Sequence, residues 1–98
     1  MMQIEFSSFV EGDLEEIGDF IAQDSPGRAV TFVRELRVKI GTIARDPLLF
    51  QLRPDIGDEA RLATMGSYAI MFRVVGETVR VERVVFGGRD LRHAFDES

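Results

Sequence analysis

The fold is decided by residues 61–88, which read RLATMGSYAIMFRVVGETVRVERVVFGG. Three runs of mostly apolar and β-branched residues are separated there by Gly66-Ser67 and by Gly76-Glu77. Two-residue connections that contain glycine are typical of tight turns between antiparallel strands. From Tyr68 onward apolar and polar residues largely alternate, as they do in a strand with one buried face. The stretch therefore predicts an antiparallel meander of three strands.

Two amphipathic helices are predicted before the meander. Ser8 and Glu11 fit a capping box at the start of the first helix. Its core stripe comprises Val10, Leu14, Ile17 and Ile21. The second helix should begin at Ser25-Pro26, a favoured cap and first position, and end at Asp46, because Pro47 disfavours helical geometry there. So short a connection predicts an antiparallel helical hairpin.

A short strand is predicted at the start of the chain, where residues 2–6 alternate between apolar and polar. The order of elements predicts an α+β fold: an N-terminal strand, an α-helical hairpin and an antiparallel three-strand meander, with the hairpin covering one sheet face. We expect part of the sheet and its arginines to stay uncovered for another macromolecule. Residues 1–98 should form a single domain, with 91–98 as a mobile tail.

Composition narrows the classes of function. Twelve basic and seventeen acidic residues give a net charge of −5, which argues against a general nucleic-acid coat protein. The absence of cysteine excludes a thiolate zinc site, and the single histidine excludes a site with several histidines. No apolar run approaches the roughly 20 residues of a membrane span, and no signal-peptide pattern opens the chain. We expect a cytoplasmic protein with no metal, cofactor, membrane or direct nucleic-acid contact.

Few residues could carry acid–base or metal chemistry. His93 and Tyr68 are each the only residue of their type, and no pattern places them beside a carboxylate. The acidic residues of the first helix, such as Asp13 and Glu16, are expected to form a solvated face. Residues that combine to catalyse a reaction are therefore not predicted.

The second helix carries a second stripe, outside its core face. It comprises Val30, Arg34, Arg37, Val38 and Arg45. Apolar residues surrounded by cations suit an amphipathic, partly acidic partner helix. The alternative is a solvated face with incidental valines.

Arg83 shares strand parity with Val79, Val81 and Val85 on the last predicted strand. A charge on an apolar stripe must find a carboxylate or carbonyl groups, because burying it alone is costly. Either Arg83 fixes the C-terminal turn from inside the protein, or it binds an acidic partner.

A set of short patterns covers almost the whole chain, from about Glu5 to Leu91. It comprises Asp13-Leu14-Glu15-Glu16-Ile17, Phe20-Ile21-Ala22, Pro26, Ala29, Phe32, Ile43-Ala44, Arg53-Pro54, Gly66-Ser67-Tyr68-Ala69-Ile70, Phe72-Arg73, Arg83-Val84, Gly87 and Arg89-Asp90. In this order and spacing the set resembles the ParE branch of the ParE/RelE toxin superfamily, from bacterial type II toxin–antitoxin systems.

The resemblance implies a toxin that poisons DNA gyrase and is neutralised when the C-terminal half of a ParD-like antitoxin folds onto it. Carried over by motif, the residues for toxicity and target binding are Arg83, Gly87, Arg89 and Asp90. The resemblance also gives the outer stripe of the second helix a purpose. The antitoxin would bind Phe20, Val30, Arg34, Arg37, Val38 and Arg45, with Phe20 as a flanking apolar contact from the first helix.

Two other functions stay open. The RelE branch cleaves messenger RNA on the ribosome, and this chain would use Arg61, Arg73, Arg89 and His93 for that reaction. Its acidity opposes binding to ribosomal RNA, and the C-terminal aromatic residue, Phe95, cannot exchange a proton.

The remaining function is that of a degenerate relative that only binds an antitoxin or itself. Many family members carry a histidine directly before the Gly-x-Arg-Asp motif, where this chain has Phe86. If that histidine matters to poisoning, the chain is weakened or acts on another target.

Overall fold

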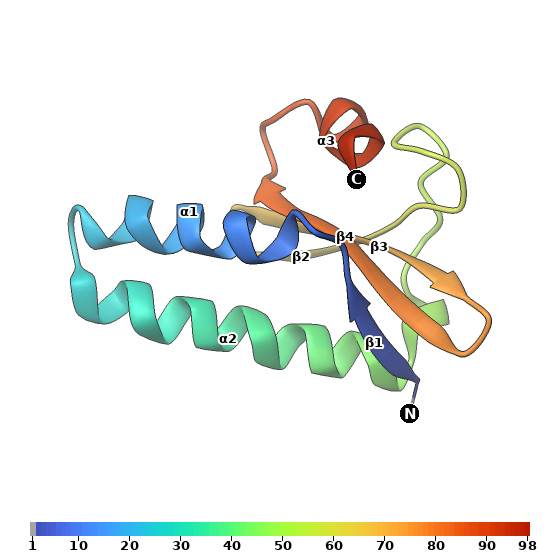
Figure 1. Ribbon diagram of the computed structural model, residues 1–98, viewed down its shortest axis with the longest axis horizontal. Coiled ribbons are helices and arrows are strands. Elements are labelled where there is room, and N and C mark those ends of the chain that lie inside the picture. The colour runs from blue at the N-terminus through green and yellow to red at the C-terminus, as the bar shows by residue number, and fades with distance from the viewer. Residues whose placement is uncertain (1) are drawn as a thin grey trace.

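The computed structural model describes residues 2–98 as a helical hairpin and a short C-terminal helix packed against one sheet (Figure 1). The elements are β1 (Gln3–Phe6), α1 (Val10–Ala22), α2 (Pro26–Arg45), a short 3-10 helix η1 (Pro47–Leu49), β2 (Arg61–Met65), β3 (Tyr68–Val75), β4 (Thr78–Phe86) and α3 (Leu91–Glu97). This order confirms the predicted α+β fold. Within residues 2–98 no helix is long and apolar enough to span a membrane.

The sheet has the strand order β1-β4-β3-β2. Both predicted turns are present, and Gly66 and Gly76 take φ angles of 57° and 60°, a left-handed conformation that favours glycine. β1 pairs with β4 in parallel, so the sheet is mixed. That pairing covers only Thr78–Val81, and β4 therefore extends past the end of β1.

The hairpin packs its apolar side chains against one face of the sheet. Of the stripe predicted for α1, Val10, Leu14 and Ile17 are buried and Ile21 is partly buried. This core contains Val10, Leu14, Ile17, Phe32, Leu36, Ile40, Ile43, Ala44, Ala63, Ile70, Phe72, Val79, Val81 and Val84. Ser25 caps α2 as predicted, accepting a hydrogen bond from the Arg28 amide at 3.3 Å. The predicted capping box at Ser8 is wrong: α1 begins without a side-chain cap, and the buried Ser7 hydroxyl instead donates to the Glu82 carbonyl.

Within residues 91–98, expected to be a mobile tail, Leu91–Glu97 form the packed helix α3. Its Ala94 and Phe95 are buried, and Asp90 caps it by accepting a hydrogen bond from the His93 amide at 3.1 Å. They join Ile56, Ala60, Met71 and Val85 in a second core on the other face of the sheet. This face, expected to be partly open, is thus covered at this position (Figure 1).

A β-bulge in β4 changes the predicted parity. Met71 pairs with Arg83 and Phe72 pairs with Val81, which leaves Glu82 as an extra residue. Arg83 therefore leaves the apolar stripe of β4, and Val84 takes its place in the hairpin core. The prediction that Arg83 continues this stripe is wrong, because strict alternation does not survive an inserted residue.

The packing of α3 makes Phe95 a test of the second core. We expect Phe95→Ala to lower the free energy of unfolding by about 3–5 kcal/mol, because it empties a fully buried ring site. Phe86→Ala is the matched control, and it should cost less than about 1 kcal/mol because Phe86 is exposed. Urea denaturation measures both values. If both variants lost equally little free energy of unfolding, residues 91–98 would contribute no more to stability than a mobile tail.

Candidate functional site

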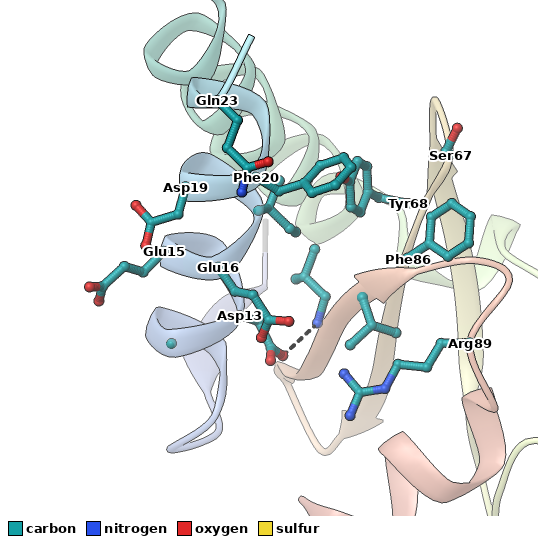
Figure 2. A pocket seen from close by; sticks show the side chains of 14 residues that line it. Asp13, Glu15, Glu16, Asp19, Phe20, Gln23, Ser67, Tyr68, Phe86 and Arg89 are labelled. Atoms are coloured by element: carbon teal, nitrogen blue, oxygen red, sulfur yellow. Dashed lines mark hydrogen bonds between the residues drawn. The ribbon is translucent and has the colours of Figure 1, made fainter. Parts of the chain in front are cut away.

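A groove with a volume of about 970 Å³ lies between α1 and the end of β4 (Figure 2). Its apolar lining comprises Ile17, Phe20, Tyr68, Val84, Val85 and Phe86. The rings of Tyr68 and Phe86 stand edge to face, with centroids 6.3 Å apart. Phe20 is 64% exposed and Phe86 is 57% exposed. Two large exposed aromatic side chains on one groove are typical of a surface that binds another macromolecule.

The two walls of this groove differ in charge. On α1, Glu16 points toward the groove, whereas Glu15 and Asp19 point outward at its rim (Figure 2). In the part of the chain that the structure describes, none of these three carboxylates forms an ion pair. On the other wall, Arg89 extends toward α1, and its only carboxylate contact among residues 2–98 is Glu97 at 3.7 Å.

Asp13, one of the groove residues, forms a buried ion pair with Arg83. Two hydrogen bonds of 2.8 Å join the guanidinium to the carboxylate, and both side chains are only 5% exposed. Asp13 also accepts the Val84 amide at 3.0 Å, and Arg83 donates to the Ala94 carbonyl at 3.1 Å. The hydrogen bonds to Asp13 raise the pKa of Arg83 above its ordinary value. The pair therefore connects α1, β4 and α3.

This geometry settles two predictions. The expectation that Asp13 lies on a solvated face is wrong, because α1 packs against the open edge of β4 and buries that carboxylate. Of the two interpretations of Arg83, the structure contains the internal one: the side chain is satisfied inside the protein. Any part that Arg83 has in target binding must therefore be indirect.

The arginines on the other sheet face also have internal partners. Arg73 and Arg80 each place Nε 3.0 Å from the buried Glu82 carboxylate, although Arg73 is not aligned for a hydrogen bond. Arg80 pairs in addition with Glu5, and the charge of Glu82 raises the pKa of Arg80. The expectation that the sheet arginines stand uncovered is wrong for these two, because the bulge places Glu82 between them.

The turn after β4 contains the other residues predicted for toxicity. Gly87 donates its amide to the Ser67 carbonyl at 2.7 Å, and a Cβ at Gly87 would lie 3.2 Å from that oxygen. Asp90 is occupied as the cap of α3. Among the four predicted residues, Arg89 alone presents an exposed charge at the groove.

The six residues predicted to bind an antitoxin fall on two surfaces. Val30 and Val38 are 61% and 66% exposed on α2. Arg34 and Arg45 are also exposed there, whereas Arg37 pairs with Glu11 of α1 at 3.1 Å. Phe20 instead lines the groove, which none of the five α2 residues does.

The residues of the nuclease alternative are only partly brought together. Arg89 and His93 each lie 3.7 Å from Glu97. Arg61 donates to the Phe50 carbonyl, and Arg73 stacks on the Phe95 ring with its guanidinium carbon 4.6 Å from the ring centroid.

Sequence reasoning missed Tyr68, Phe86 and Ile17 as parts of one groove, since they come from three separate elements. The available signal was Phe20, a large apolar residue off the core stripe of its helix. Within residues 2–98, no three His, Asp or Glu side chains are placed to hold a metal ion.

Comparison with known proteins finds matches to a protein family and to solved structures. The sequence profile of one family, described as the ParE toxin of the type II toxin–antitoxin system parDE, matches residues 4–91. A solved structure, described as the chromosomal ParDE toxin–antitoxin system from P. aeruginosa, is similar with a TM-score of 0.76 and 20% sequence identity. The match covers 88% of this chain and 96% of that chain, and at this identity it shows a shared fold. No curated protein sequence matches.

Proposed function

The chain belongs to the ParE toxin family of type II toxin–antitoxin systems, and on that premise we propose that it stops growth by binding DNA gyrase. In the proposal, a ParD-like antitoxin neutralises it in the cytoplasm. The observation that carries the proposed binding mode is the exposed Arg89 beside the exposed aromatic residues of the groove. Arginine and aromatic side chains dominate the binding energy of protein interfaces.

The four toxicity residues have different parts in this proposal. Arg89 contacts the target directly. Gly87 lets the turn approach Ser67 closely, and Asp90 caps α3, so both hold Arg89 in place. Arg83 acts from the interior by fixing α3 and α1 to β4.

The internal contacts of Arg61 and Arg73 support target binding over RNA cleavage. Both guanidinium groups already have partners inside the protein, so their reuse on a phosphate backbone would break those contacts. The nuclease and the degenerate relative are the alternatives that the cell experiment below distinguishes from gyrase binding.

The outer stripe of α2 supports an antitoxin contact. Val30 and Val38 are exposed apolar residues, and Arg34 and Arg45 lie beside them without an ion-pair partner in the described chain. An amphipathic helix with acidic residues would bury the valines and pair with the arginines. We keep Arg37 in this surface as the residue that joins it to α1 through Glu11.

We expect Arg89→Ala to abolish growth arrest when the chain is expressed without its antitoxin, because Arg89 carries the exposed charge of the binding surface. Arg92→Ala is the matched control: Arg92 is also exposed, does not line the groove and should leave the arrest unchanged. Growth at equal protein levels is the measurement. Full toxicity of Arg89→Ala would contradict the assignment.

The response of cells that express the unaltered chain tests the target. Filamentation with a DNA-damage response is expected for gyrase poisoning. Rapid loss of messenger RNA with arrested translation would overturn the proposal in favour of the nuclease, and harmless expression would do so in favour of the degenerate relative.

We expect Val38→Glu to weaken antitoxin binding about tenfold or more, because it places a charge among the apolar contacts of an acidic helix. The fold should stay intact, since Val38 is exposed. Val75→Glu is the matched control, a similarly exposed valine on β3, and it should leave the affinity unchanged. Calorimetric titration of each variant with the antitoxin measures the affinity. Unaltered binding by Val38→Glu would refute the α2 contact.

A further inference from the structure

The last residues of β4, beside the groove, have no neighbouring strand on the side of β1. β1 covers β4 only as far as Val81, and beyond it the Val84 amide points away from β3 to Asp13. The Gly87 amide points the other way, to the Ser67 carbonyl. Neighbouring residues of a strand direct their backbone groups to opposite edges. The Phe86 amide, two residues after that of Val84, therefore points into the groove as a donor for another chain.

The side chains around this edge favour one kind of occupant. Phe20 and Phe86 stand exposed along it and offer apolar contact to alternate residues of an extended chain. Glu16 points into the groove without a cationic partner among residues 2–98, and Asp19 lies at the rim. The α1 wall therefore attracts lysine or arginine and repels acidic residues, whereas Arg89 on the opposite wall attracts acidic groups there.

We propose that the groove receives an extended segment of the antitoxin as a short added strand on the edge of β4. Its apolar side chains lie between Phe20 and Phe86, and its basic side chains face Glu16 and Asp19. This inference rests on the proposed function and deepens it. The antitoxin then has two segments of opposite charge: an acidic helix on α2 and a basic strand in the groove.

The location of Phe20 supports two separate antitoxin segments. It lies among the groove residues and apart from the α2 stripe, so one helical segment on α2 does not account for its exposure. The hairpin is also polarised in charge. Within these two helices, the carboxylates without an ion-pair partner among residues 2–98 (Glu15, Glu16 and Asp19) belong to α1, and the arginines without one (Arg34 and Arg45) belong to α2. A partner of a single charge sign would be repelled by one of the two helices.

The test uses the full chain and the antitoxin encoded by the adjacent reading frame. We expect Glu16→Lys/Asp19→Lys to weaken binding about tenfold or more, because two attractive contacts become repulsive. Asp58→Lys/Glu77→Lys is the matched control: it makes the same change in net charge at exposed positions outside the groove and should alter the affinity less than about twofold. Circular dichroism verifies that all variants are folded.

Hydrogen exchange supplies a second readout. The Phe86 amide should exchange about tenfold or more slowly in the complex than in the free chain, since an added strand would accept its hydrogen. Unprotected Phe86 in a tight complex, or binding that is equal for both double variants, overturns the groove proposal and leaves the proposed function intact. If the unaltered chain does not bind the protein encoded by the adjacent reading frame, the proposed function itself is contradicted. A dimer of this chain that protects Phe86 without antitoxin would assign the groove to a second copy.

Discussion

The buried ion pair between Asp13 and Arg83 is the contact on which the rest of this structure depends. It joins the first turn of α1 to β4, satisfies the Val84 amide at an unpaired strand edge and reaches α3 through the Ala94 carbonyl. Removing one partner of such a pair leaves an uncompensated buried charge, at a cost of about 3–5 kcal/mol. Because the groove lies between α1 and β4, the pair also fixes the distance between its walls.

This arrangement separates the groups that hold the fold from those free to bind. From the sequence, Arg73 and Arg80 look available and Arg83 could have either an internal or an external partner, yet each has a carboxylate partner inside the protein. Two exposed surfaces remain that could bind a partner. One is Arg89 with the groove, and the other is the valine stripe of α2. These surfaces offer separate places for apolar, basic and acidic contacts.

The local features of the fold could be predicted from the sequence, and the long-range ones could not. Turns at Gly66 and Gly76 and the Ser25 cap depend on neighbouring residues, so their signals are visible in a few letters. Asp13 and Arg83 are 70 residues apart, and an acidic residue destined for burial looks like its solvated neighbours. The bulge at Glu82 has no glycine to mark it, and α3 owes its order to the second core rather than to its own seven residues. The groove was missed for the same reason, since three elements form it.

Hydrogen exchange in the variant Asp13→Asn tests most directly whether this one pair holds the helices to β4. Asparagine keeps an acceptor for the Val84 amide, but it removes the charge and replaces the other acceptor oxygen of Arg83 by an NH2 donor. Glu16→Gln makes the same chemical change at an exposed position. We predict that Asp13→Asn loses about 3–5 kcal/mol of stability and that the Ala94 amide exchanges at least about tenfold faster, while Glu16→Gln behaves like the unaltered protein. An Asp13→Asn variant of unchanged stability, with α3 still protected, would contradict the central role of the pair.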